Sequence, residues 1–132
     1  VGKQYRYVVV DCEAGLEHLS RRTAGDVDVL ILLSDPSVRG LETIKRVTEL
    51  VSELKTKVGR MAFAFTRVTD GIPPELAAAA KARGLPEPHA IPEDAEVRDL
   101  DTKGHPLVGV KPDSPAYQAV KELLRAVGVL DG

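Results

Sequence analysis

The chain has 132 residues, of which 43% are hydrophobic and 29% are charged, and its formal net charge is −2. These values are those of one ordinary globular domain. They exclude a strongly basic nucleic-acid-binding domain, and no apolar run is long enough to span a bilayer. A single cysteine cannot form an internal disulfide, so we expect a protein of the reducing cytoplasm with no membrane partner.

Residues 5–10 form the first apolar run, and they predict a strand. Its consecutive valines indicate that both faces are covered, as in a parallel sheet. The run ends at Asp11, with Gly15 four residues later, and a short helix is expected over 16–22. A carboxylate can hold a Mg²⁺-bound water and a glycine lets the backbone approach a phosphate, so the pattern fits a nucleotide-sensing loop. It fits equally a buried strand followed by a solvated acidic turn.

A second buried strand is predicted over residues 27–33. Ser37 or Asp35 can cap the long helix that follows, which the spacing of its apolar residues predicts over 38–57. Gly59 is expected to end this helix.

Predicted strands and helices continue to alternate in the middle of the chain. A short strand is predicted over 61–65, an alanine-rich helix over 75–83 closed by Gly84, a brief strand over 89–91 and a helical turn over 93–100.

After an irregular stretch at 101–110, Asp113 or Ser114 is expected to cap a last helix with Pro115 in its first turn. Five residues at helical spacing are predicted to form the buried stripe of this helix: Tyr117, Val120, Leu123, Leu124 and Val127.

This alternation of strands and helices predicts a single α/β domain over 1–132, with a parallel sheet between two helical layers. Right-handed crossovers would place the ends of the strands along one edge of the sheet. Four residues mark these ends: Asp11, Ser34, Thr66 and Pro92.

The order of these segments resembles a known family. VVVDCEAGLEHLSRRT, followed by VDVLILLSDPSVRGLETIKRV, AFTRV and the segment that begins IPEDAEVRDL, is similar to the carbon monoxide dehydrogenase maturation ATPases of the CooC group. These belong to the deviant-Walker, SIMIBI-class P-loop NTPases, together with MinD, ParA and the nitrogenase iron protein. The resemblance covers nearly the whole chain.

The resemblance implies roles near the phosphates for residues of the first loop. Asp11 would be the catalytic switch II acid that holds the Mg²⁺ shell through water, and Gly15 would lie near the γ-phosphate. Glu17 and His18 would lie on the segment that moves with nucleotide state and meets the partner.

The resemblance also implies an adenine-binding wall built from two later loops. Its members are Thr66, Arg67, Ile91, Pro92 and Glu93, with a polar contact added by Asp94. The family has Asn where this chain has Thr66, and a single hydroxyl cannot pair two positions of adenine as an amide does.

A larger departure is the absence of any Gly-rich phosphate loop of the GxxxxGK[ST] kind. In the family this loop, its lysine and its strand lie upstream of the switch II acid. We therefore expect this chain to be the C-terminal portion of such an ATPase, lacking the P-loop strand. That strand would lie between the strands ending at Asp11 and Ser34, which must otherwise pair directly or leave a gap for another chain to fill.

The leading hypothesis is the C-terminal part of a MinD/CooC-like ATPase that serves nickel insertion into carbon monoxide dehydrogenase. The intact protein would use Mg-ATP and form a homo-oligomer, whereas this chain alone would require no cofactor and hydrolyse no ATP. The alternative is a non-catalytic interaction module that self-associates through an exposed sheet edge. A receiver-like domain, with Asp11 and Glu13 as its acids, is a third interpretation.

Overall fold

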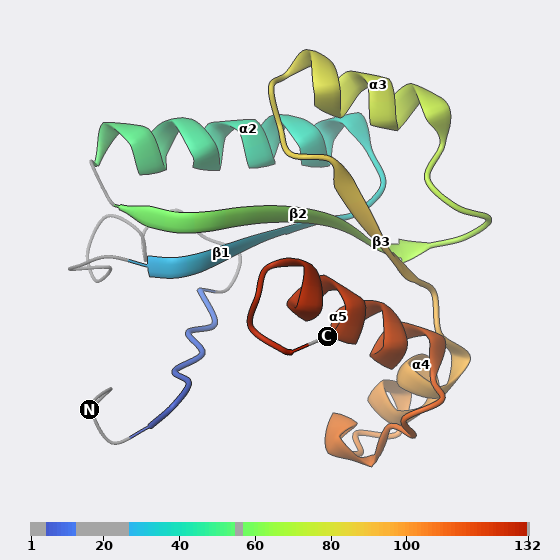
Figure 1. Ribbon diagram of the computed structural model, residues 1–132. Coiled ribbons are helices and arrows are strands. Elements are labelled where there is room, and N and C mark those ends of the chain that lie inside the picture. The colour runs from blue at the N-terminus through green and yellow to red at the C-terminus, as the bar shows by residue number, and fades with distance from the viewer. Residues whose placement is uncertain (1–4, 13–26, 55–56, 132) are drawn as a thin grey trace.

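The structure, a computed structural model, describes residues 5–12, 27–54 and 57–131. Its centre is a parallel sheet with the strand order β1-β2-β3. Helices cover both faces of this sheet (Figure 1), so the predicted α/β class is confirmed. The strands are β1 (Val27–Ser34), β2 (Val58–Val68) and β3 (Pro88–Pro92), and the helices are α2 (Val38–Glu53), α3 (Pro74–Ala82), α4 (Ala95–Thr102) and α5 (Pro115–Ala126).

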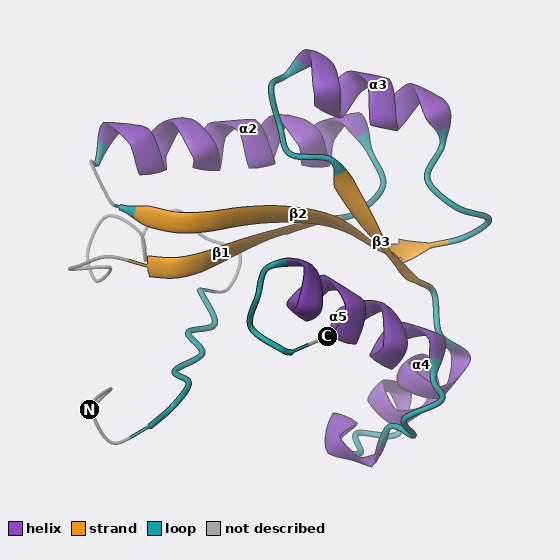
Figure 2. Cartoon of the chain, in the orientation of Figure 1, coloured by secondary structure: helices purple, strands orange, loops and turns teal. Residues whose placement is uncertain are grey.

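The central strand, β2, divides the core into two layers because successive side chains of a strand point to opposite faces. Phe63 and Phe65 point toward α2 and α3, and their rings meet edge to face with centroids 4.8 Å apart. Ala62 and Ala64 point the other way and pack against α5. Figure 2 shows α2 and α3 on one side of the strands and α5 on the other. The sheet is therefore buried on both faces, as parallel sheets require.

The N-terminus of α2 confirms the predicted cap. The Ser37 hydroxyl oxygen accepts a hydrogen bond from the Gly40 N–H at 3.0 Å, which satisfies one of the donors left over in the first helical turn. Leu41 and Ile44 then point into the layer that contains the phenylalanines.

The C-terminus of α2 differs from the prediction, because the helix ends at Glu53 and Gly59 does not end it. Gly59 lies inside β2, where a Cβ atom would come within 2.6 Å of the Asp28 carbonyl oxygen. The glycine is thus needed for the close approach of two strands, which periodicity in one segment cannot reveal.

The last helix confirms Ser114 as its cap, but the predicted buried stripe is only partly correct. Leu123 and Val127 are buried against the sheet, whereas Tyr117 and Val120 are exposed. The central strand presents Ala62 and Ala64 to α5, and this helix buries a narrower strip than its apolar spacing suggests.

Residues 5–12 contradict the prediction of a first strand, because they are irregular. Residues 8–10 are exposed, Val9 to 92%. The Tyr7 hydroxyl donates a hydrogen bond to the carbonyl oxygen of Val129 at 3.2 Å, and the segment lies beneath the sheet on the side of α5 (Figure 1). Strands are stabilised by paired neighbours, and no described strand adjoins this segment. The helix predicted over 16–22 lies outside the described residues.

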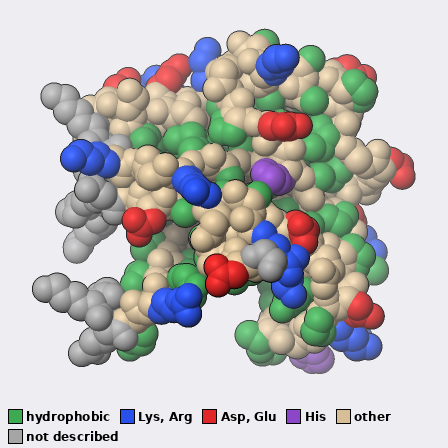
Figure 3. Space-filling view, viewed as in Figure 1, with side chains coloured by type: hydrophobic (Ala, Val, Ile, Leu, Met, Phe, Trp, Pro, Cys, Tyr) green, Lys and Arg blue, Asp and Glu red, His purple; other side chains and the backbone are tan. Residues whose placement is uncertain are grey.

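Charged side chains of both signs are spread over the face of the molecule in Figure 3. No helix in the described part of the chain combines the length and the apolar character that a membrane span requires.

The layered core gives the first prediction. Leu41 is fully buried between α2 and the sheet, so Leu41→Ala should lower the free energy of unfolding by about 2–5 kcal/mol in urea titrations, through lost burial and a cavity. Leu54→Ala is the matched control, because Leu54 is exposed and should cost less than about 1 kcal/mol. Equal losses for the two variants would contradict the layer assignment.

Candidate functional site

The carboxyl ends of the three parallel strands lie at one edge of the sheet. β1 ends at Ser34, β2 at Val68 and β3 at Pro92, and Val68 and Pro92 are register partners. The Thr66 hydroxyl donates a long hydrogen bond of 3.4 Å to the Ser34 carbonyl oxygen, which ties β2 to β1 there. In open α/β sheets this edge is where ligands bind.

The end of β2 is irregular in a way that redirects its side chains. The pairing of β2 with β3 shifts register between Phe65 and Val68, and Arg67 within this bulge has a φ of 53°. Asp70 in the following turn has a φ of 57°. A left-handed conformation costs a non-glycine residue roughly 1–2 kcal/mol, and bulges and strained residues occur often beside functional sites. Arg67 is thus exposed at the carboxyl end of β2, where the sequence predicted a binding site.

The loop after β3 packs directly against the end of β2. The Glu93 N–H donates to the Val68 carbonyl oxygen at 3.0 Å, and the Arg98 guanidinium pairs with the Glu93 carboxylate at 3.2 Å. Ile91 packs into the α5 layer. The structure thus brings together the two loops that were predicted to wall a base, namely the residues Thr66, Arg67, Ile91, Pro92 and Glu93.

Asp94 lies within this loop, but its carboxylate faces inward, with 7% of the residue exposed. Oδ1 accepts hydrogen bonds from the N–H groups of Glu96 at 2.9 Å and Val97 at 3.3 Å, which caps α4. Oδ2 accepts from the Ser114 hydroxyl and from the Ala116 N–H, the latter at 3.0 Å. One side chain therefore caps two helices. Its pairing with Ser114 was not predicted, because no sequence spacing links residues twenty positions apart.

These hydrogen bonds set the charge state of Asp94. The Ser114 hydroxyl, followed by the Ala116 N–H, holds the pKa of the Asp94 carboxyl below its ordinary value. Burial acts in the opposite direction, and the N–H groups of Val97 and Glu96 add to the lowering. The carboxylate is thus kept ionised by donors that recognise its charged form.

Of the residues predicted to lie near the phosphates, Asp11 alone falls within the described part of the chain. Asp11 is exposed and lies outside the sheet, because residues 5–10 form no strand. Gly15, Glu17 and His18 lie outside the described residues. Among the residues that are described, no three His, Cys, Asp or Glu side chains are grouped to hold a metal ion.

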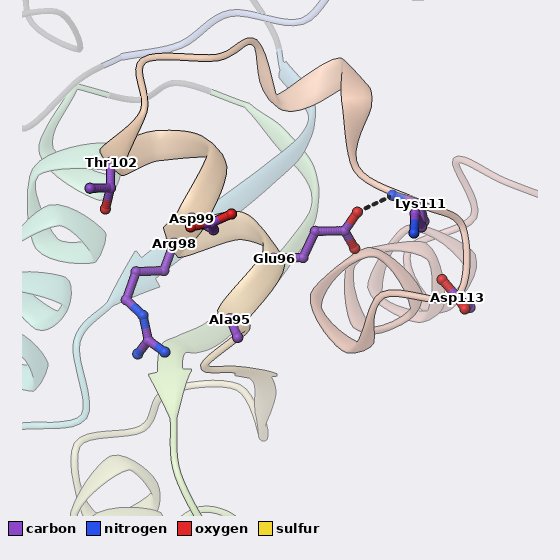
Figure 4. A pocket seen from close by; sticks show the side chains of 7 residues that line it. All are labelled: Ala95, Glu96, Arg98, Asp99, Thr102, Lys111 and Asp113. Carbon is purple, nitrogen blue, oxygen red and sulfur yellow. Dashed lines mark hydrogen bonds between the residues drawn. The ribbon is translucent and has the colours of Figure 1, made fainter.

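An open hollow lies beside α4, and its lining includes Arg98, the ion-pair partner of Glu93 (Figure 4). Glu96 points toward Lys111, whose backbone N–H it accepts at 3.1 Å, while Arg98 points to the other side of the helix. Acidic and basic side chains alternate along this hollow, so it offers no consistent charge to a phosphate.

Comparisons with known proteins find ATP-binding proteins among the sequences similar to this chain. No protein-family model matches the chain. It is 37% identical over 127 residues to an uncharacterized ATP-binding protein of Methanocaldococcus jannaschii, covering 96% of this chain and 50% of that protein. A second ATP-binding protein of the same organism is 29% identical over 118 residues, covering 88% of this chain and 44% of the other.

Two further similar proteins have names that state a more specific role. The carbon monoxide dehydrogenase accessory protein CooC of Rhodospirillum rubrum is 36% identical over 55 residues, which cover 42% of this chain and 21% of CooC. The crystal structure of the cell division ATPase MinD of Pyrococcus furiosus superposes with a TM-score of 0.58 and 26% identity, over 76% of this chain and 42% of MinD.

The fold is P-loop NTPase-like. The two relatives named above that match most of this chain are described as ATP-binding proteins. The chain spans about half the length, 50% and 44%, of these curated relatives.

The environment of Asp94 gives the second prediction. Asp94→Asn should destabilise the protein at neutral pH, because an amide presents a donor where two donors already converge. The pKa is lowered in the folded state, so the stabilisation is present above the unfolded value of about 3.9 and is lost as pH falls through the folded value. The difference between the two proteins in urea titrations should therefore shrink as the pH falls below about 3.9.

Asp101→Asn provides the control, since Asp101 is exposed in α4 and should give the wild-type midpoint at every pH. A stability difference between Asp94→Asn and wild type that stays constant down to pH 2 would contradict the role assigned to the ionised carboxylate.

Proposed function

We propose that the carboxyl edge of the sheet is the base-binding side of a nucleotide site, and that the chain is the C-terminal part of a MinD/CooC-like ATPase. The observation that carries this proposal is the meeting of the loops after β2 and β3, tied by the Glu93 N–H to Val68 hydrogen bond of 3.0 Å. The similarity in fold to MinD and the ATP-binding relatives support it.

The outer edge of β1 supports the proposal that part of the nucleotide domain comes from outside these residues. Within the described chain β1 pairs with β2 alone. The Val27 N–H donates a hydrogen bond to the Lys57 carbonyl oxygen at 2.8 Å, so it points toward β2. Because successive residues of a strand alternate in direction, the backbone N–H and C=O groups of Asp28, Leu30 and Leu32 point to the outer side.

The segment with residues 8–10 does not use this edge, although its valines are strand formers and are exposed. Residues 5–10 therefore do not pair directly with β1. We propose that an upstream strand, followed by the phosphate loop and its lysine, lies between them in the longer protein. In that arrangement residues 5–10 would become the strand predicted from the sequence.

The described residues fit the base end of a nucleotide and not yet its phosphate end. Pro92 and the aliphatic part of Arg67 offer apolar contact to a flat ring, and the Thr66 hydroxyl offers one acceptor or donor. ATP with Mg²⁺ would supply the γ-phosphoryl group that is transferred and the cation that neutralises it. The described loops that follow β1, β2 and β3 contain no lysine for the phosphates.

The remaining assignments are proposals that follow from the resemblance. Asp11 would hold the Mg²⁺ shell through water, Gly15 would lie near the γ-phosphate, and Glu17 and His18 would carry nucleotide state to a partner. We propose a cytoplasmic homo-oligomer with carbon monoxide dehydrogenase maturation as its purpose. The partial match to CooC supports this purpose.

A non-catalytic module that self-associates is the second candidate function. The open edge of β1 favours it, because an unprotected strand edge pairs readily with another strand. Such a module would bind no nucleotide, so the two candidates give opposite results in one titration.

The third prediction follows from this contrast. Calorimetric titration of the 132-residue chain should detect Mg·ADP and Mg·ATP binding with micromolar dissociation constants, while a phosphate-release assay should detect no turnover, because the phosphate-binding lysine is absent. Absence of binding would favour the self-associating module, and ATP turnover by this chain would contradict the assignment as a part of the ATPase.

A pair of variants tests whether binding occurs at the proposed edge. Thr66→Asn should tighten ADP relative to GDP by about three- to tenfold, the equivalent of one added hydrogen bond. Thr69→Asn, in the exposed turn that follows β2, should leave this ratio unchanged. Equal effects of both variants would place the nucleotide elsewhere.

A further inference from the structure

Asp94 joins elements that are distant in sequence. Its Oδ1 accepts from the first turn of α4, and its Oδ2 accepts from the Ser114 hydroxyl and the Ala116 N–H of α5. Both carboxylate oxygens of Asp94 therefore accept hydrogen bonds from protein groups, and only 7% of the residue is exposed. A carboxylate used in this way has little capacity left for a ligand.

The same loop is fixed to the sheet immediately before this point. The Glu93 N–H donates to Val68, the last residue of β2, and Pro92 pairs with Val68 in register. The two residues proposed to face a base thus lie between a hydrogen bond to β2 on one side and the Asp94 joint on the other.

The C-terminal helix is the third element of this arrangement. α5 packs through Leu123 and Val127 against the alanines of β2, and its N-terminus is held by Ser114 and Asp94. A shift of α5 along the sheet would break the bonds to Asp94 first, because they are at the end of the helix nearest the carboxyl edge.

We propose that Asp94 is a positioning residue that does not touch the base: its carboxylate, bonded to Ser114 and to the first turns of α4 and α5, holds Pro92 and Glu93 in place against the end of β2. This inference rests on the proposed function for the purpose of the loop, and it replaces the predicted polar contact of Asp94 with adenine. A consequence is reciprocal coupling: a nucleotide that orders the loop also stabilises the N-terminus of α5.

Hydrogen exchange on the 132-residue chain tests the positioning role without a ligand. Ser114→Ala keeps the Asp94 charge and removes one of its donors, so it should speed exchange of the Glu93 amide by about fivefold, the change expected for loss of a helix cap. The effect should persist at low denaturant, where exchange occurs by local opening.

Ser37→Ala is the matched control, because Ser37 is also a serine cap but serves α2. It should speed exchange in the first turn of α2, at Gly40, and leave Glu93 unchanged. Asp94→Asn should reproduce the effect of Ser114→Ala at Glu93. Unchanged Glu93 exchange in Ser114→Ala, or an equal change in Ser37→Ala, would overturn the positioning role, since either would indicate only general loss of stability.

A titration with Mg·ADP separates this inference from the proposed function. Ser114→Ala should weaken ADP binding several-fold and Ser37→Ala should not. If wild type binds no Mg·ADP, the nucleotide purpose of the loop is overturned together with the proposed function, while the exchange result alone decides whether Asp94 positions the loop. If wild type binds and Ser114→Ala binds equally well, the proposed function stands and the coupling is overturned.

Discussion

The fixed alignment of β2 between its two parallel neighbours is the constraint on which the rest of the structure depends. Phe63 and Phe65 pack one face of this strand under α2 and α3, and Ala62 and Ala64, which alternate with them, allow α5 close to the other face. With the strand held in this way, its carboxyl end can bend at Arg67, where the pairing with β3 shifts register, while the pairing before Phe65 stays regular. The candidate site is thus an irregular edge on a rigid central strand.

The N-terminal segment shows the opposite case, in which a strand-forming sequence has no strand to join. Residues 8–10 have the composition of a buried parallel strand and yet are exposed. A strand needs hydrogen bonds from a neighbouring strand, which composition alone cannot supply. In the described chain the outer edge of β1 lies open. Apolar exposure and an open edge in one chain are complementary features, and together they motivate a strand contributed from elsewhere in the protein.

Local signals in the sequence predicted most of the fold. Ser37 and Ser114 were expected caps and are caps, and Gly84 closes α3 with a φ of 72°. Local signals failed where tertiary contacts decide. Gly59 was expected at a helix end, but it permits the approach of β1 to β2, and Tyr117 was expected to be buried, but it lies beside a narrow contact and is exposed.

The features of the candidate site likewise fall into those that the sequence predicts and those that depend on tertiary contacts. That the loops after β2 and β3 would meet followed from parallel topology, and the structure brings Thr66 and Pro92 to one edge as expected. The double cap made by Asp94 could not be predicted, since it depends on where α5 begins in space relative to β3. Asp11 lies outside the sheet because residues 5–10 form no strand, and the loop after it falls outside the described residues.

The central claim is that the edge formed by the ends of β2 and β3 binds the base of a nucleotide. Chemical-shift mapping of the ¹⁵N-labelled chain with Mg·ADP tests it most directly. The account predicts concentration-dependent shifts at the amides of Thr66, Arg67 and Glu93, with none at Val27 or Val58 on the opposite edge, where β1 and β2 begin. Shifts confined to the opposite edge, or none at saturating Mg·ADP, would contradict it.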